Sequence, residues 1–344
     1  MSIRSFTLAV PFLALMMLPG ASPVAVRREG DPVGQTWTGS PAPPSTTQNG
    51  TVSPRWLISA EELSDELHSS LSPAPVILDV RWTLAGSDPD GYADAHIPGA
   101  AFVNLDRELA GPPGERGRHP LPDPLDLQIA WRAAGIEEVS RVVVYDGGPG
   151  LAAARAWWLL RWSGLTQVRV LDGGFAAWTA AGRPVASGPP AVRAPGSVTV
   201  RPGGMPVVAI DEAAELAADP SAVLLDARAA PRFRGEVEPL DPVAGHIPGS
   251  ANLPSTELVD ADGLFLPVAD LAVVFASHGI NPQGINPQGI NSGDPAARAA
   301  ASCGSGITAC QLVLAGAVIG ADLALYPGSY SQWCAAGRPV AVGP

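Results

Sequence analysis

Cys303 begins a glycine-rich segment whose residue types could do nucleophilic chemistry. It is followed by Gly304, Ser305 and Gly306, and then by an apolar run that starts at Ile307. Glycines allow a tight turn in which successive N–H groups point into one small space. If the apolar run is helical, these groups lie at a helix N-terminus, where the macrodipole favours an anion such as a thiolate or persulfide. The segment predicts a reactive cysteine, and the alternative is an unreactive cysteine in a loop before a helix.

The composition excludes several classes of protein. The chain has 344 residues, of which 46% are hydrophobic and 16% charged, so two domains with sizeable cores can form. A net charge of −12 argues against nucleic acid or an anionic membrane as a partner. The three cysteines make no disulfide framework, and the spacing of Cys303 and Cys310 is not one that binds zinc. We expect no metal and no cofactor.

The first part of the chain differs from the rest. Residues 1–22 resemble a secretory signal peptide, with Arg4, an apolar run and then small residues. An upstream start codon that adds a meaningless apolar leader is the alternative, so export and a cytoplasmic location both stay open. Residues 23–54 are rich in Pro, Gly, Ser and Thr, which predicts a disordered linker.

Beyond the linker, short apolar runs alternate with helical patterns. Residues 76–80, 141–145 and 168–171 are typical of buried parallel strands, and residues 152–162 are typical of a buried helix. This alternation predicts an α/β fold in which a mostly parallel sheet is flanked by helices.

Three short motifs occur twice, in the same order and at nearly constant spacing, which indicates two copies of one domain. A tandem Gly-Ile-Asn-Pro-Gln repeat from Gly279 predicts a surface-loop insertion in the second copy. The repeated motifs are residues 78–81 and 225–228, residues 96–100 and 246–250, and residues 180–185 and 335–340.

The repeat also places the chemistry. We assign residues 55–188 to the first domain, residues 189–206 to a linker and residues 207–344 to the second domain. The equivalent turn carries Asp146 in the first domain and Cys303 in the second. Because α/β sheets place their sites at the carboxyl ends of strands, the second domain is predicted to be catalytic. The first is predicted to be non-catalytic or to form one wall of the active-site cleft.

The two His-Ile-Pro-Gly turns, the Asp-x-Arg strand ends, the Gly-Arg-Pro-Val tails and the Cys-Gly-Ser-Gly-Ile-Thr-Ala loop together resemble those of tandem-domain rhodanese-type sulfurtransferases. The loop is most similar to that of the 3-mercaptopyruvate sulfurtransferases, because Gly304 and Ser305 stand where thiosulfate enzymes usually carry basic residues. The resemblance spans residues 55 to 344. It implies a small-molecule donor, 3-mercaptopyruvate or thiosulfate, whose sulfur forms a persulfide on Cys303. The sulfur then passes to cyanide or to a thiol, such as that of a thioredoxin-like protein.

The resemblance further implies a proton relay and a cradle for the persulfide. Ser305 would join His96 and Asp88 in the relay, with Asp90 as a competing choice for the acid. His96 could instead be a turn histidine that only binds the backbone, because His246 recurs in the second copy. The cradle would be formed by the backbone N–H groups of Gly304, Ser305, Gly306, Ile307 and Thr308.

Arg232 matches the substrate-binding arginine of the family, and its planar guanidinium suits a carboxylate. A solvated surface arginine is the alternative. The family's second arginine is missing, because Leu240 and then Asp241 occupy its place, and Arg234 could compensate for it.

Two other functions compete with sulfur transfer. A phosphatase loop of this fold needs an arginine six residues after the cysteine, where this chain has Ala309. A non-catalytic rhodanese-like scaffold or sulfur carrier is favoured by the missing arginine and by the alanine-rich, weak strand pattern before Cys303.

Overall fold

A computed structural model describes residues 56–69, 73–280 and 298–344 of the chain. The predicted leader, the whole of the linker that follows it and most of the pentapeptide repeat lie outside these residues. Those three expectations therefore stay predictions.

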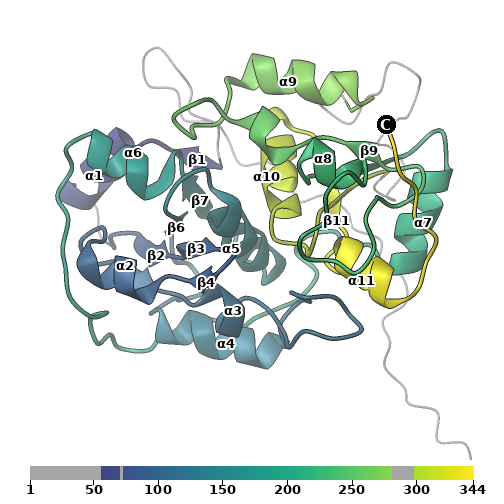
Figure 1. Cartoon of the computed structure of the whole chain (residues 1–344). Coiled ribbons are helices and arrows are strands. Elements are labelled where there is room, and N and C mark those ends of the chain that lie inside the picture. The colour runs from purple at the N-terminus through teal and green to yellow at the C-terminus, as the bar shows by residue number, and fades with distance from the viewer. Residues whose placement is uncertain (1–55, 70–72, 281–297) are drawn as a thin grey trace, which may run out of the picture. The chain divides into compact units, whose positions relative to one another are not determined.

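The first domain is built on a five-stranded parallel sheet with the strand order β1-β7-β6-β2-β5. Figure 1 labels β1, β7, β6 and β2 of this sheet. A small antiparallel hairpin, β3–β4, follows β2. The strands are β1 (Leu57–Ile58), β2 (Val76–Asp79), β3 (Trp82–Thr83), β4 (Gly86–Ser87), β5 (Ala101–Phe102), β6 (Val142–Tyr145) and β7 (Val168–Leu171). The helices are α1 (Ala60–His68), α2 (Pro89–Asp94), α3 (Leu105–Glu108), α4 (Pro124–Ala133), α5 (Leu151–Trp162) and α6 (Gly174–Ala180).

The second domain has a four-stranded parallel sheet with the order β11-β10-β8-β9. A bridge between Val207 and Leu325 continues the pairing beyond β11. The strands are β8 (Val223–Asp226), β9 (Ala251–Asn252), β10 (Ala299–Ser302) and β11 (Ala324–Leu325). The helices are α7 (Ile210–Ala218), α8 (Ala230–Phe233), the 3-10 helix η1 (Ser255–Leu258), α9 (Val268–Ser277), α10 (Ala309–Ile319) and α11 (Ser329–Ala335).

The predicted fold class, two tandem α/β domains with parallel sheets, is confirmed. The four residues of β6, three valines and a tyrosine, are all buried, as expected for a central strand of a parallel sheet. The alanine-rich β10 also forms a regular strand, because it pairs in parallel with β8 on one side and β11 on the other. Pairing and burial therefore outweigh the weak β-propensity of alanine.

The sequence repeat is a structural repeat. The Asp-x-Arg motif forms a buried ion pair at the end of β2, where Arg81 bonds Asp79, and again at the end of β8, where Arg228 bonds Asp226. In both copies the acid is the last residue of its strand and is fully buried. These pairs hold the edges of the sheets from which the functional loops leave.

In the part of the chain that the structure describes, no helix is long and apolar enough to cross a membrane. The same residues contain no cluster of three or more His, Cys, Asp or Glu side chains that could hold a metal ion.

Candidate active site

Cys303 follows β10 directly and lies at the carboxyl end of the second sheet, with a side chain that is 2% exposed. The N–H of Gly306 donates a hydrogen bond of 3.1 Å to its Sγ. Among the described residues, no acceptor binds the N–H groups of the other loop members, namely Gly304, Ser305, Ile307 and Thr308. The loop that follows Cys303 therefore keeps several N–H groups available to an anion.

Hydrogen bonds to the first residues of α11 hold the cysteine loop in place. The N–H of Cys303 donates to Ser329 Oγ at 3.0 Å, and the N–H groups of Tyr330 and Ser331 donate to the carbonyls of Cys303 and Gly304 at 3.0 and 2.9 Å. Among the described non-glycine residues, only Ser329 has a positive φ, of 51°. Such a conformation costs on the order of 1–3 kcal/mol and persists where surrounding contacts require it.

Gly306 allows a close contact that no other residue type would permit. Its φ is +84°, and a Cβ at this position would lie 2.2 Å from the carbonyl oxygen of Pro327. Gly306→Ala is expected to lower the free energy of unfolding by about 2–5 kcal/mol, since backbone strain and overpacking add. The matched control is Gly320→Ala, where φ is +80° but nothing lies within 4 Å, and a loss of about 1–2 kcal/mol is expected. Urea unfolding measures both variants, and equal losses would contradict the steric argument.

The histidine that contacts Ser305 is His119, from the proline-rich loop of the first domain. Its Nδ1 lies 2.8 Å from Ser305 Oγ, and its Nε2 lies 3.9 Å from Asp106 Oδ1. Ser305, His119 and Asp106 are therefore arranged as a hydroxyl, an imidazole and a carboxylate in line. This arrangement is the one that lets a serine hydroxyl exchange its proton.

Hydrogen bonds and aromatic packing hold this line in place. Trp82 Nε1 donates to Asp106 Oδ1 at 2.8 Å, and the N–H and hydroxyl of Ser87 both donate to Oδ2 at 2.8 Å. The Trp82 ring also packs edge-on against His119, with centroids 5.9 Å apart. Partial burial opposes ionisation of Asp106, but the hydrogen bonds from Trp82 and Ser87 outweigh it and lower its pKa. Burial, and then repulsion by Arg155, lowers the pKa of His119 to about 4, so the ring is neutral at physiological pH.

The predicted pairing of Ser305 with His96 is not found. His96 Nδ1 binds the carbonyl of Tyr92 at 2.8 Å, and its ring stacks on Tyr92 with centroids 3.9 Å apart. His246 repeats this in the second domain, where it binds the carbonyl of Phe233 at 2.8 Å and stacks on that ring. The alternative reading, a turn histidine that binds the backbone, is the one the structure supports.

The acids proposed with His96 are not at the relay either. Asp88 is the N-cap of α2, where its carboxylate accepts the N–H of Gly91 at 2.8 Å. Asp90 is an exposed residue in the first turn of the same helix. One signal could have pointed to the histidine that contacts Ser305: His119 has no counterpart in the second copy, whereas His96 does.

A buried arginine joins the relay loop to the cysteine loop. Arg155 on α5 is 0% exposed, and it has no acidic partner among the described residues. It donates to the carbonyl of Gly306 at 3.1 Å in the second domain, and to those of Leu109, His119 and Pro120 at 3.2–3.3 Å in the first. Burial lowers the pKa of Arg155, but a guanidinium stays charged at neutral pH.

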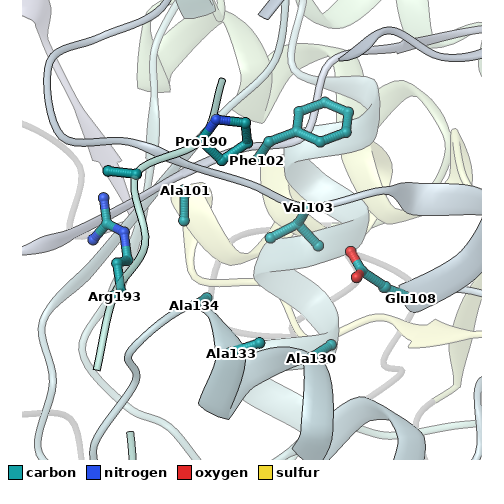
Figure 2. A pocket seen from close by; sticks show the side chains of 10 residues that line it. Ala101, Phe102, Val103, Glu108, Ala130, Ala133, Ala134, Pro190 and Arg193 are labelled. Carbon is teal, nitrogen blue, oxygen red and sulfur yellow. The ribbon is translucent and has the colours of Figure 1, made fainter. Parts of the chain in front are cut away.

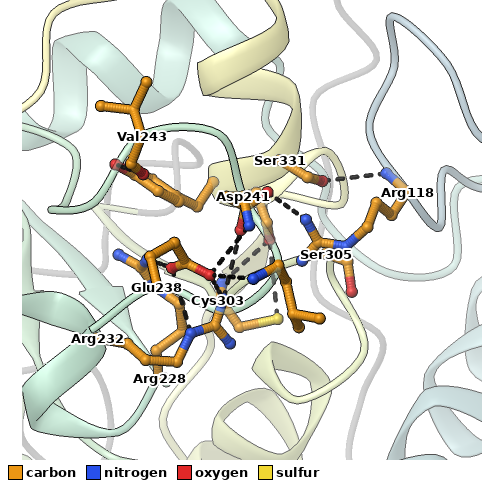
Figure 3. A network of polar contacts seen from close by, with 12 residues as sticks. Arg118, Arg228, Arg232, Glu238, Asp241, Val243, Cys303, Ser305 and Ser331 are labelled. Atoms are coloured by element: carbon orange, nitrogen blue, oxygen red, sulfur yellow. Dashed lines mark hydrogen bonds and ion pairs between the residues drawn. The ribbon is translucent and has the colours of Figure 1, made fainter. Parts of the chain in front are cut away.

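Arg232 lies in a network of charged groups beside the cysteine loop (Figure 3). Its guanidinium bonds Glu238 at 2.7 and 3.2 Å and Asp241 at 3.4 Å. An alanine Cβ at Gly304 would lie 3.5 Å from both Nη atoms of Arg232, so the arginine is adjacent to the loop. Arg234, suggested as a compensating arginine, instead pairs with the exposed Glu236.

The equivalent turn of the first domain is filled by its own carboxylate. The side chain of Asp146 accepts backbone N–H groups at 2.9–3.2 Å, and Asp146 itself is 4% exposed. A bound carboxylate therefore takes the place that an external or covalent anion would need. The donors are the N–H groups of Gly148, Gly150, Ala152 and Ala153.

The other two cysteines do not share the environment of Cys303. Cys310 on α10 is fully buried, its Sγ donates to the carbonyl of Gly306 at 3.3 Å, and burial raises its pKa to about 12. Cys334 on α11 is half-buried, and burial raises its pKa too. Neither is therefore a good nucleophile at neutral pH.

A small pocket in the first domain lies between β5, α4 and residues 190–193 (Figure 2). Its lining is mostly apolar, and the carboxylate of Glu108 in it accepts the backbone N–H of Asn104 at 2.7 Å. None of its lining residues belongs to the cysteine loop or the relay.

Comparisons with known proteins show the family to which the chain belongs. The profile of the rhodanese-like domain matches residues 59–181 and 209–336. A Pseudomonas aeruginosa protein named "Probable 3-mercaptopyruvate sulfurtransferase" is 43% identical over 299 residues, which cover 83% of this chain and 98% of that protein. The "Thiosulfate/3-mercaptopyruvate sulfurtransferase 2" of Arabidopsis thaliana is 33% identical and covers 81% of this chain and 85% of its own length.

A solved structure is similar over both domains. The 3-mercaptopyruvate sulfurtransferase SseA of Escherichia coli matches with a TM-score of 0.66 and 29% identity, over 80% of this chain and 99% of that one. Two matched domains, extensive identity and a cysteine loop at the carboxyl end of the second sheet lead to one conclusion: the chain belongs to the rhodanese family and is a two-domain sulfurtransferase.

Proposed function

We propose that Cys303 takes a sulfur atom from 3-mercaptopyruvate, holds it as a persulfide and passes it to a thiol or to cyanide. The observation that supports this donor is the contact between Ser305 Oγ and His119 Nδ1. Ser305 lies two residues after Cys303 in the cysteine loop. Removing sulfur from 3-mercaptopyruvate leaves an enolate that needs a proton on carbon. Thiosulfate leaves sulfite, which needs none, so a relay has a purpose with the first donor only.

The chemistry of the first half-reaction balances with these residues. The Cys303 thiolate attacks the donor sulfur, the carbon–sulfur bond breaks, and its electron pair passes to pyruvate enolate. Ser305 takes the proton of the donor thiol as neutral His119 accepts the serine proton, and the relay returns a proton to the enolate carbon. The products are pyruvate and a persulfide anion on Cys303.

The second half-reaction needs only the loop and an acceptor. The persulfide anion is stabilised by the N–H of Gly306 and by the loop N–H groups that have no acceptor among the described residues. An acceptor thiolate or cyanide attacks the outer sulfur and releases the Cys303 thiolate. The N–H groups of the loop that stay without an acceptor within the described residues favour catalysis over the alternative of a non-catalytic rhodanese-like scaffold. Ala309, the first residue of α10, disfavours a phosphatase, because a phosphatase needs an arginine at this position to bind phosphate.

The persulfide is tested by mass spectrometry of the intact protein. After incubation with 3-mercaptopyruvate and no acceptor, we expect one added sulfur atom per chain, located on the peptide that contains Cys303. Cys303→Ser should gain none, and Cys310→Ser, which removes a thiol from the next helix, should still gain one. No added sulfur on the wild-type protein with either donor would refute the proposed function.

A further inference from the structure

The network beside Cys303 contains an arginine that comes from the first domain. Arg118 directly precedes His119 in the proline-rich loop, and its Nη1 forms an ion pair with Asp241 of the second domain. An alanine Cβ at Gly304 would lie 3.0 Å from Arg118 Nη2. Arg118 and Arg232 therefore approach the same point of the cysteine loop from the two domains (Figure 3).

Asp241 holds both guanidiniums at this point. Its Oδ1 accepts from Arg118 and its Oδ2 lies 3.4 Å from Arg232 Nη2, while its side chain is 2% exposed. The acid stands in the place where the family resemblance implies a second arginine. Its buried charge is balanced by the arginine of the other domain.

The two arginines keep donors for a further anion. Among the described residues, no acceptor binds Arg118 Nη2 or Arg232 Nη1, and both of these nitrogens face Gly304. The side chains are 29% and 18% exposed, so each still reaches open space. Two guanidinium edges that meet over one loop can bind a carboxylate with charge-assisted hydrogen bonds.

The backbone around Arg118 is seated closely on the second domain. The N–H of Arg118 donates to Ser331 Oγ at 3.1 Å. At Gly117, where φ is +103°, a Cβ would lie 2.8 Å from the carbonyl oxygen of Gly328. This seating gives Arg118 a defined position, which a specific binding residue requires.

We propose that Arg118 is the second arginine of the donor site and binds the donor's carboxylate together with Arg232, while Asp241 is a positioning residue that orients Arg118. The inference rests on the proposed function, and it makes the donor site a composite of both domains. One loop of the first domain then supplies both Arg118, which binds the donor's carboxylate, and His119, which is the base of the relay.

The first experiment is steady-state kinetics of Arg118→Ala with 3-mercaptopyruvate. We expect KM to rise about 10–100-fold with a much smaller change in kcat, because charge-assisted hydrogen bonds to the bound donor are lost. Arg116→Ala is the matched control: Arg116 is an exposed arginine of the same loop, and its KM should stay within about twofold. An unchanged KM in Arg118→Ala, with an active wild-type enzyme, would overturn the inference and leave the proposed function standing.

The role of Asp241 is tested by a double-mutant cycle. Asp241→Asn should raise KM about tenfold in the wild-type background and have little effect in Arg118→Ala, since it acts through that arginine. Additive effects of the two changes would refute the positioning role.

A binding readout separates the inference from the reaction. Pyruvate, the carboxylate product, is titrated calorimetrically into Cys303→Ser, which cannot turn over. Adding Arg118→Ala to this protein should weaken pyruvate binding about tenfold or more, whereas adding Arg116→Ala should not. Equal pyruvate affinity with and without Arg118 would overturn the carboxylate clamp, whatever the wild-type activity is.

Discussion

Arg155→Met is expected to lower the free energy of unfolding by about 3–5 kcal/mol, because it leaves buried carbonyl oxygens of both domains without their donor, at about 1–3 kcal/mol each. The arginine is 0% exposed, and its guanidinium binds carbonyls of both domains. Methionine fills a similar volume but donates nothing, so the carbonyls of Gly306 and His119 would lose a charged donor inside the protein. Chemical unfolding monitored by tryptophan fluorescence measures the loss.

The same substitution should also impair sulfur transfer beyond its effect on stability. Arg155 is the donor that binds the His119 carbonyl and the Gly306 carbonyl at once, so its loss loosens the relay relative to the cysteine. Arg155→Lys should recover little, because a single ammonium cannot reproduce the planar fork that reaches both carbonyls.

Arg161→Met is the matched control for Arg155→Met. Arg161 lies on the same helix, is only half-buried, and stacks its guanidinium on Trp56 at 4.4 Å. Its replacement is expected to cost about 1 kcal/mol or less. A loss at Arg155 no larger than that at Arg161 would show that the buried guanidinium does not hold the two loops together.

The strands and the cysteine loop could be predicted from sequence because each depends on residues that are close together in the chain. The parallel strands follow from short runs of buried apolar residues, such as Val142 to Tyr145. The cysteine loop follows from its glycines, and the structure places the N–H of Gly306 on Cys303 Sγ as a turn of that kind allows. The internal repeat predicts the domain that carries the site, because it aligns the turn containing Asp146 in the first domain with the turn containing Cys303 in the second.

The relay could not be predicted because it is a contact between distant parts of the chain. His119 lies in a loop rich in proline that has no periodicity, 186 residues before Ser305. The motif containing His96 was more visible because it recurs, but its recurrence as His246, which binds a backbone carbonyl in the same way, indicates a structural role. Arg118 was missed for the same reason, since nothing local ties it to Asp241.

His119→Gln is expected to lower kcat/KM for 3-mercaptopyruvate by about 10²–10⁴-fold, the usual contribution of a positioned acid–base group. Glutamine can still bind Ser305 Oγ, but it cannot accept the serine proton. With thiosulfate as donor no carbon is protonated, so kcat/KM for thiosulfate should change by only a few fold. Because both donors use Cys303, the ratio of the two rates isolates the relay.

The pH dependence of this ratio gives a second test with a defined sign. Burial and Arg155 lower the pKa of His119 to about 4, so the imidazole accepts a proton at any pH above that value. The ratio of mercaptopyruvate to thiosulfate kcat/KM should therefore stay flat from about pH 8 down to about pH 5 and fall as the pH approaches 4. In His119→Gln the ratio should be low and independent of pH over this range. A wild-type ratio that falls near pH 6.5, the ordinary value for histidine, would mean that His119 is not held neutral by its burial beside Arg155.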